Sequence, residues 1–341
     1  MAIPDARTGD DQAHGPHNVR TVIGVDAGGT GTRAVLLDET GRVLSLAKAG
    51  PGNPTSAGLD LAVANNVSAC VQALLGAPQT AEAPSLVALC MAGVLAAGGR
   101  VPDIDVALAA AGIGARTAFK GDVLGAYFSA TAEPDGAVLI VGTGATGARI
   151  QDGEFVAMSD GLGWLIGDEG SGFWIGQQVV RAVCRALDHR GPDTALVDAL
   201  MGIIDVTPGL LQGWRDERLM HVLAWAYGGR PVELAAAGRL VSAVGDDPVA
   251  QRIIARAAEY LVTNVSAVLD DRTDGPIVLG GSVVDPSSPV GQLVAAELGE
   301  RVLHAKDGVA GAGLIALREL GVPADAEVLA RITGGLVSLR Q

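Results

Sequence analysis

The stretch TVIGVDAGGTGT, residues 21–32, decides the fold. An apolar run stops at Asp26, and glycines and threonines follow before the chain resumes as AVLLD at residues 34–38. The chain then turns and returns as RVLSL, residues 42–46. Runs rich in β-formers that are separated by short glycine-containing turns predict antiparallel strands. The Gly/Thr loop is therefore predicted to join two strands rather than a strand and a helix.

A second segment follows the same plan. The apolar run AVLIV, residues 137–141, leads into GTGATG, residues 142–147, and then into ARIQ, an Asp-Gly turn and EFVA. The repeated order of strand, Gly/Thr loop, strand, turn and strand predicts two similar domains, each presenting its loop to a shared cleft. Helical patterns between these segments make the chain an α/β protein; they are expected over residues 59–75, 172–188, 248–269 and 289–300.

The chain length fits two domains. With 341 residues, of which 49% are hydrophobic, it can bury two sizeable cores. We predict a disordered tail over residues 1–18 and a first domain over residues 19–120. A second domain follows over residues 121–320, and a C-terminal helix within residues 321–341 packs on the first domain.

Composition excludes several classes of partner. The chain has 24 Lys and Arg against 38 Asp and Glu, and its formal charge of −14 argues against nucleic-acid binding. The three cysteines are widely spaced without a C-x-x-C pair, so neither a zinc site nor a disulfide framework is indicated. No apolar run reaches the roughly 18 residues of a membrane span, and residues 1–18 lack the apolar core of a signal peptide. We therefore expect a cytoplasmic protein without a membrane partner.

The Gly/Thr loops suit phosphate binding. Glycines let backbone N–H groups approach phosphate oxygens, and threonine hydroxyls add uncharged donors. No Lys follows a Gly, so the Walker A loop is absent, and the hairpin after residues 142–147 argues against the dinucleotide fingerprint. Two such loops could clamp the β- and γ-phosphates of ATP, with Asp26 holding Mg²⁺ through water. Alternatively, both are only tight turns in a glycine-rich chain.

Three further segments carry candidate polar groups. Asp122 stands between a strand and a helix, where it could be an N-cap or could take a proton from an attacking hydroxyl. The segment DGLGWLIGDEGSG, residues 160–172, combines apolar surface with carboxylates, which suits a sugar; a helix-capping loop is the alternative. Asn53 lies in GPGNPTS, residues 50–56, whose prolines stiffen the loop and could present the amide to a ligand.

Together these motifs resemble a known family. They are DAGGTGTR (26–33), GPGNPTS (50–56), GDVLGA (121–126), VGTGATG (141–147), GLGWLIGDEGSGFWIG (161–176), VLGGS (278–282) and GVAGAGLIAL (308–317). The chain is similar to N-acetylglucosamine kinases of the BadF/BadG/BcrA/BcrD ATPase family, in the sugar kinase, heat-shock protein 70 and actin superfamily. The resemblance implies two ribonuclease-H-like (actin-like ATPase) domains that flank a cleft for ATP and an amino sugar.

The resemblance also implies roles for individual residues. Asp122 would be the catalytic base that deprotonates the sugar 6-hydroxyl, and Asp26 would hold Mg²⁺ through water. ATP would be bound by Gly28, Gly29, Thr30 and Thr32, by Gly142, Thr143 and Gly144, and by Gly280, Gly281 and Ser282. The sugar would be contacted by Asn53, Asp122, Gly161, Leu162, Gly163 and Asp168.

Two departures concern the choice of sugar. Ala145 stands where the second loop of the family often carries Ser, and Leu162 stands where some members carry Trp. N-acetylglucosamine is the expected substrate, with glucosamine or another hexose as the alternative.

Other functions of the same fold are less well supported. An activator-type ATPase of the family binds an iron–sulfur cluster through cysteines, which the Gly/Thr segments and residues 160–172 lack. A sugar-sensing regulator needs a DNA-binding module, for which residues 1–18 are too short. A non-catalytic sugar-binding protein would not need Asp26, Asp122 and Asp168 together. A homodimer is left open.

Overall fold

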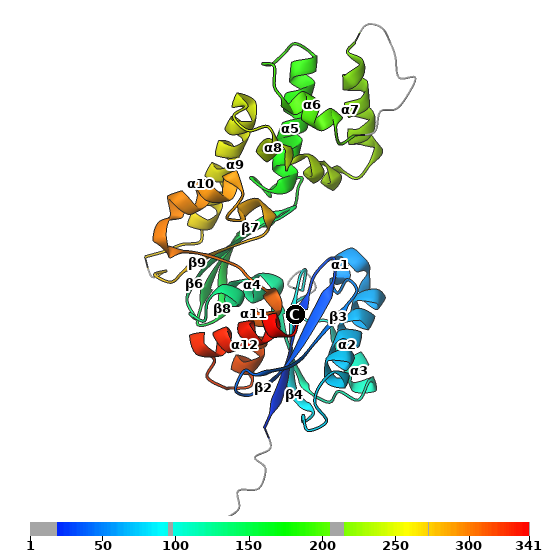
Figure 1. Ribbon diagram of the computed structural model, residues 1–341, viewed down its shortest axis with the longest axis vertical. Coiled ribbons are helices and arrows are strands. Elements are labelled where there is room, and N and C mark those ends of the chain that lie inside the picture. The colour runs from blue at the N-terminus through cyan, green and yellow to red at the C-terminus, as the bar shows by residue number, and fades with distance from the viewer. Residues whose placement is uncertain (1–18, 95–97, 205–214, 272, 341) are drawn as a thin grey trace, which may run out of the picture.

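The computed structural model describes residues 19–94, 98–204, 215–271 and 273–340, so the predicted tail lies outside the described residues. The described chain forms two five-stranded sheets (Figure 1). The first sheet contains β1 (Thr21–Ala27), β2 (Thr32–Asp38), β3 (Val43–Ala49), β4 (Pro84–Met91) and β5 (Arg116–Gly121). The second contains β6 (Gly136–Val141), β7 (Ala145–Gln151), β8 (Glu154–Asp160), β9 (Ile277–Gly280) and β10 (Val302–His304).

The two sheets share one topology. The first has the order β3-β2-β1-β4-β5, and the second has β10-β9-β6-β7-β8, which is the same order from the other end. In each sheet the first three strands are antiparallel, and the last two run parallel to the first. These pairings confirm the two predicted hairpins, and the shared topology confirms an α/β fold of two actin-like domains.

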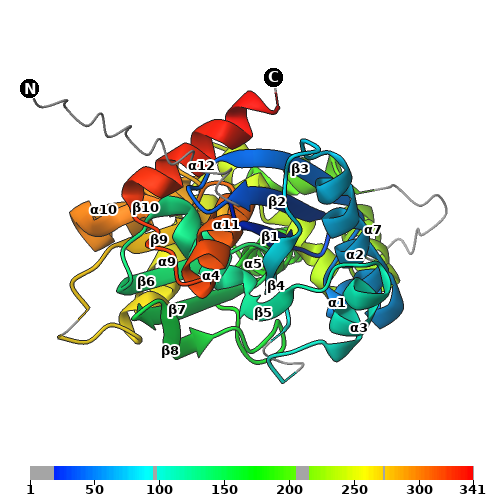
Figure 2. The same ribbon diagram turned by 90° about the horizontal axis from the view of Figure 1, so that it is seen from below.

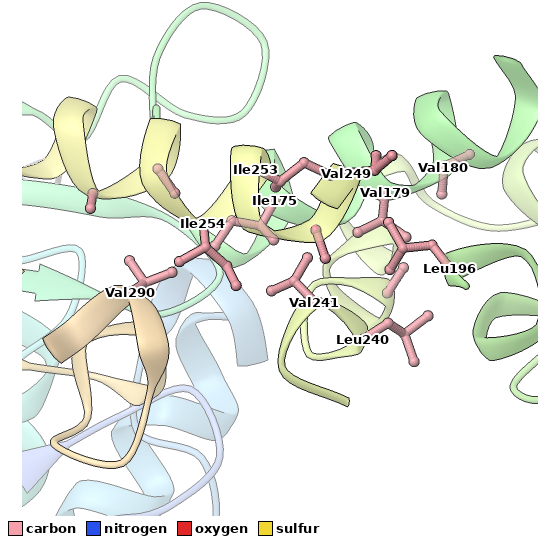
Figure 3. Close-up of a cluster of buried hydrophobic side chains, with 14 of the residues drawn as sticks. Ile175, Val179, Val180, Leu196, Leu240, Val241, Val249, Ile253, Ile254 and Val290 are labelled. Carbon is pink, nitrogen blue, oxygen red and sulfur yellow. The ribbon is translucent and has the colours of Figure 1, made fainter. Parts of the chain in front are cut away.

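Helices cover both faces of each sheet. Around the first sheet, one face packs against α2 (Leu59–Leu75) and α3 (Pro102–Ala110), and the short α1 (Pro54–Ala57) precedes α2. The second sheet continues into α5 (Gly172–Leu187), α6 (Leu196–Met201), α7 (Glu217–Gly228), α8 (Leu240–Ala243), α9 (Pro248–Ser266) and α10 (Pro289–Leu298), with 3-10 segments at Pro231–Ala237, Ser282–Val284 and Gly299–Arg301. We call the first sheet with α1, α2 and α3 the first lobe, and the second sheet with α5 to α10 the second lobe. Figure 3 shows Ile175 and Val179 of α5 against Ile253 and Ile254 of α9 in the core of the second lobe.

Alternation along the strands divides the core into layers. In β1, Val22 packs between the two sheets, whereas Ile23 and Val25 pack under α2 and α3. In β6, Val138 packs between the sheets, and Leu139 packs under α5 and α9. This two-residue period is that of strands buried on both faces.

Two helices fill the space between the sheets: α4 (Asp122–Ala130) and α11 (Gly308–Glu319). They cross at glycines, because a Cβ on Gly311 would lie 1.9 Å from the carbonyl oxygen of Gly125. The helix α11 also packs on β1, where a Cβ on Gly24 would lie 2.4 Å from the nitrogen of Gly313. Thus α11, whose sequence range falls in the predicted second domain, packs closely on the first sheet.

The last helix, α12 (Ala326–Ser338), lies beside β3 and α11 (Figure 2). A Cβ on Gly335 would meet Val43 at 2.6 Å, and one on Gly41 would meet Val328 at 2.7 Å. The guanidinium of Arg331 donates to the carbonyl of Thr40. Within the described residues, no helix is both long and apolar enough to cross a membrane.

Candidate functional site

Carboxylates gather at one edge of the first sheet. Since β1, β4 and β5 are parallel, their carboxyl ends meet at the same edge, where Asp26 nearly ends β1 and Asp122 directly follows β5. Burial raises the pKa of the half-buried Asp122 carboxyl above its ordinary value, and the negative charge of Asp26 raises it further. In Figure 1, α1 marks this edge, at the end of the first lobe nearest the second sheet.

Asp26 is held in a network of ion pairs. Arg33 lies directly across the hairpin from Asp26, and its guanidinium pairs with Oδ2 of Asp26 and, at 2.6 Å, with Oδ1 of Asp307. Arg340 pairs with Oδ2 of Asp307. The backbone at Gly308 comes so close that a Cβ there would lie 2.9 Å from Oδ2 of Asp26. The start of α11 and both strands of the first hairpin therefore converge on this carboxylate.

Sequence reasoning missed Arg33 and Asp307. A signal existed for Arg33, because it stands at the start of the strand after the loop of the predicted hairpin, across from the strand that carries Asp26. Asp307 carried only a weak signal, as an Asp before a helix, where it accepts from the amide of Val309 at 3.3 Å.

The first Gly/Thr loop is fixed through its carbonyls. Gly28 donates to Gly31 at 3.0 Å, and the Gly28 carbonyl accepts from Gly52 at 3.0 Å and Asn53 at 3.2 Å. Within the described chain, the exposed amides of Gly29 and Thr30 have no hydrogen-bond acceptor. These two amides are therefore the free donors of the loop.

Thr32 connects this loop to the segment at residues 50–52. Its hydroxyl is fully buried and donates to the carbonyl of Gly50 at 2.8 Å. A Cβ on Gly52 would meet the Thr32 hydroxyl at 2.3 Å. In this structure Thr32 joins the loop to residues 50–52 instead of facing solvent.

Asn53 lies next to the end of β4. Its Oδ1 accepts from the amide of Thr55 at 2.8 Å and caps α1. A Cβ on Gly93 would come within 3.3 Å of that oxygen, so the loop after β4 touches the Asn53 side chain. In the described residues, the Asn53 Nδ2 group has no acceptor and can donate to a ligand.

The second Gly/Thr loop is held by the start of α5. The amide of Gly172 donates to the carbonyl of Gly142 at 2.8 Å, and that of Phe173 donates to the carbonyl of Thr143 at 3.2 Å. The hydroxyl of Ser171 caps the helix by accepting from the amide of Trp174 at 3.2 Å. These bonds use the loop carbonyls and, among the described residues, leave the amides of Thr143 and Gly144 without acceptors.

The third motif lies against the second loop. A Cβ on Gly281 would lie 2.3 Å from the carbonyl oxygen of Val141, the last residue before the loop. Gly281 has φ +95°, a left-handed conformation that favours glycine, and both Gly281 and Ser282 are exposed, whereas Gly280 is buried in β9. The second sheet thus places residues 142–144 and 280–282 at one edge.

Two aspartates hold residues 160–169 on the second loop. The carboxylate of Asp160 accepts from the amides of Asp168 at 2.7 Å and Glu169 at 3.2 Å. The Asp168 carboxylate is buried and accepts from the amide of Ala145 at 3.3 Å. Its burial raises the pKa of Asp168, and the Asp160 charge raises it further. Sequence reasoning missed Asp160, which organises this loop.

Between these aspartates the backbone faces solvent. Gly161 donates to the carbonyl of Ala145 at 2.9 Å, and Leu162 is 64% exposed. Gly163 has φ +88° and open space where a Cβ would stand. Residues 161–163 therefore form an accessible turn beside the second Gly/Thr loop.

We expect Asp160→Ala to lower the free energy of unfolding by about 1–3 kcal/mol, because the loop amides of Leu162, Asp168 and Glu169 lose their acceptor. Asp152→Ala is the matched control: Asp152 also has positive φ (+53°, against +58° for Asp160), but its carboxylate accepts no hydrogen bond within the described residues. Urea unfolding of both variants measures the difference. Equal losses would show that backbone conformation, and not the hydrogen bonds, sets the cost.

The candidate residues thus form two groups. Asp26, residues 28–30, Thr32, Asn53 and Asp122 belong to the first sheet and its edge, and the other candidates lie at the edge of the second. No hydrogen bond in the described parts of the chain joins the two groups.

The metal expected at Asp26 has few protein ligands. Within the described residues, no cluster of three His, Cys, Asp or Glu could hold a metal ion. The Asp26 Oδ2 is paired with Arg33, while Oδ1 has no partner there. One free carboxylate oxygen fits Mg²⁺ that reaches the protein through water and substrate phosphates.

Comparisons with known proteins agree with this fold. The chain is 26% identical over 320 residues to an N-acetyl-D-glucosamine kinase of Dictyostelium discoideum, covering 86% of this chain and 97% of that protein. It is 28% identical over 222 residues to a glucosamine kinase of Vibrio cholerae, covering 62% and 74% of the two chains. The crystal structure of a candidate N-acetylglucosamine kinase from Chromobacterium violaceum superposes with a TM-score of 0.64 at 25% identity, over 88% of this chain and 99% of that one.

The sequence pattern of one family spans nearly the whole described fold. It matches residues 23–316, from β1 through α11, and so includes both Gly/Thr loops and both sheets. The chain belongs to the BadF/BadG/BcrA/BcrD ATPase family.

Proposed function

We propose that this protein is an ATP-dependent sugar kinase that phosphorylates the 6-hydroxyl of N-acetylglucosamine. The observation that carries the proposal is that Asp122 and Asp26 stand close enough at one sheet edge for the Asp26 charge to raise the pKa of Asp122. The same edge also bears loop amides without acceptors among the described residues. In this proposal Asp122 accepts a proton and Asp26 faces the phosphates. The family supports ATP as the phosphoryl donor.

Asp122 is the proposed catalytic base. It is the first residue of α4, whose N-cap is Gly121, so its carboxylate does not serve as the N-cap of that helix. Burial and the charge of Asp26 raise its pKa, which makes the ionised form a stronger proton acceptor. In the proposed reaction Asp122 takes the proton of the 6-hydroxyl while that oxygen attacks the γ-phosphorus and the bond to ADP breaks.

The free amides of the two Gly/Thr loops are the proposed phosphate donors. Those of Gly29 and Thr30 come from the first lobe, and those of Thr143 and Gly144 from the second. Closure of the lobes would bring both sets onto the transferring phosphoryl group and exclude water.

Arg33 fixes one oxygen of Asp26, so that the other can accept from a water ligand of Mg²⁺. When bound, Mg²⁺ would neutralise developing charge on the phosphate oxygens.

Two features support an amino sugar as the acceptor. The Asn53 Nδ2 group, at the same sheet edge as Asp122, can donate to a sugar oxygen. The turn at residues 161–163 and the buried Asp168 offer a second surface from the other lobe. The relatives in Dictyostelium discoideum and Vibrio cholerae are named for N-acetylglucosamine and glucosamine, which makes glucosamine the second candidate.

A panel of acceptors decides between the two sugars. We expect kcat/KM for N-acetylglucosamine to exceed that for glucosamine, glucose and N-acetylmannosamine by about tenfold or more, the ratio that about 1.4 kcal/mol of differential binding produces. Initial rates of ADP release with Mg-ATP measure this ratio, and a reaction without sugar is the control. A higher value for glucosamine would keep the kinase and overturn N-acetylglucosamine as its substrate.

A further inference from the structure

A large groove lies in the second lobe, outside the candidate kinase site. It has a volume of about 1250 Å³ and lies between α5, α7, α9 and the 3-10 segment Pro231–Ala237. Its apolar surface includes Val180, Val222 and Ile253, and Trp174 and Tyr260 add aromatic rings. None of the residues proposed to bind ATP or sugar lines it. The groove is therefore a second concave surface with a chemistry of its own.

The charge of the groove is opposite to that of the protein. Its described lining contains no Asp or Glu but includes five arginines: Arg181, Arg185, Arg190, Arg252 and Arg256. Elsewhere acidic residues dominate, since the chain has only 24 Lys and Arg against 38 Asp and Glu. Two pairs stand one helical turn apart, residues 181 and 185 on α5 and residues 252 and 256 on α9. Adjacent helices thus present two short rows of guanidinium groups.

Most of this positive charge is not neutralised inside the protein. Arg190 pairs with Asp188 at 3.0 Å, and Arg256 pairs with Glu259 at 2.7 Å. Across the described chain, the side chains of Arg181, Arg185 and Arg252 have neither a hydrogen bond nor an ion pair. Three exposed guanidinium groups therefore remain available to one ligand, and each can bind an anion through two parallel N–H donors.

Two aromatic residues, Trp174 and Tyr260, lie in contact with each other beside these charges. The guanidinium of Arg256 lies 4.5 Å from the centroid of the Tyr260 ring, and that ring meets Trp174 edge-on with centroids 5.4 Å apart. Trp174 follows Gly172 and Phe173, whose amides hold the second Gly/Thr loop. The groove thus combines an aromatic and aliphatic surface with cationic side chains.

We propose that this groove binds a small polyanion that carries an apolar or aromatic part, the chemistry of a phosphorylated metabolite of nucleotide size. Ligand sites of small molecules usually measure about 300–1,000 Å³, so the groove is large enough for both the charged and the apolar part. Self-association is disfavoured here, because a two-fold contact through the groove would set one copy's arginine rows against the other's. The site is additional to the proposed kinase reaction.

The test uses 8-anilinonaphthalene-1-sulfonate, an aromatic anion that fluoresces in apolar surroundings, with inorganic tripolyphosphate as its competitor. The full-length protein should bind the dye saturably, and tripolyphosphate should displace it. The variant Arg181→Gln/Arg252→Gln should weaken tripolyphosphate displacement by about tenfold or more. The control Arg42→Gln/Arg239→Gln also removes two positive charges, but from exposed residues outside the groove lining. It should leave displacement of the dye by tripolyphosphate unchanged.

Three outcomes would overturn the proposal. The first is that tripolyphosphate displaces the dye from the groove variant as well as from the wild type. The second is that displacement weakens equally in the control variant. The third is that the wild type sediments as a dimer which only the groove substitutions dissociate. Both variants should keep wild-type sugar kinase rates, so a failure of the kinase assignment would leave this test intact.

Discussion

Asp122→Asn is expected to lower kcat by about 10²–10⁴-fold, the usual contribution of a general base, while ATP still binds. The amide has nearly the same shape as the carboxyl group but cannot take the proton from the sugar hydroxyl. Because residues 28–30 and 142–144 are untouched, the KM for ATP should change little. Initial rates of sugar-dependent ADP release measure kcat, and nucleotide binding is measured separately by calorimetry.

The same variant should fold at least as stably as the wild type. Burial and the charge of Asp26 raise the pKa of Asp122 in the folded protein, so folding disfavours the ionised form of this carboxyl group. The resulting loss of folding stability is absent at a pH below the pKa of Asp122 in the unfolded chain. It develops as the pH rises through the pKa in the folded protein, and it is complete above that pKa. Asp122→Asn removes the charge, so its melting temperature at pH 7 should equal or exceed that of the wild type.

Asp103→Asn is the matched control, since Asp103 is an exposed aspartate in the first turn of α3 and is not one of the candidate site residues. It should keep wild-type kcat. Wild-type turnover in Asp122→Asn would end the assignment of Asp122 as the base, and a large loss of stability would assign it a structural role instead.

Gly311→Ala should destabilise the protein by about 3 kcal/mol or more, beyond the usual cost of an overpacked core. The added Cβ would lie 1.9 Å from the carbonyl oxygen of Gly125 and 2.8 Å from the nitrogen of Ser129. Both atoms belong to the backbone of α4, so no flexible side chain can move aside. The two helices between the sheets would have to separate, which would also displace Asp122 at the start of α4.

Gly334→Ala is its control on α12. A Cβ there would meet nothing within 4 Å, so the helix should gain about 0.5–1 kcal/mol from the lost flexibility of glycine. Urea unfolding gives both free energies. Equal stability of the two variants would contradict the close crossing of α4 and α11.

Much of the fold can be predicted because its local signals agree. The apolar runs of β1 and β6, their Gly/Thr turns and the two-residue alternation all favour the same hairpins. Long helices such as α2 and α9 also stand out, and Pro248 and the Asp247 cap mark where α9 begins. The shared topology of the two sheets follows from the repeated pattern.

Other elements depend on tertiary contacts and escape such reasoning. The helices α3, α6 and α7 have no clear pattern that predicts them, and packing stabilises them. The place of α11 between the sheets depends on backbone contacts at Gly311 and Gly313, which no periodicity indicates.

The candidate site divides in the same way. Asp26 and Asp122 can be found because each stands next to the end of a strand. Thr32 looks like a phosphate donor in the motif, yet its hydroxyl is turned to Gly50 by the hairpin geometry. Asp160 escapes notice because its role depends on a left-handed turn, at φ +58°, that brings the amides of residues 168 and 169 back to it.

Transfer of the γ-phosphate of ATP to N-acetylglucosamine tests the central claim most directly. We expect one phosphorylated sugar for each ADP formed, with the phosphate on the 6-oxygen by phosphorus NMR and no transfer to 6-deoxy-N-acetylglucosamine. ADP release that proceeds at the same rate without sugar, or none with any sugar, would contradict a sugar kinase.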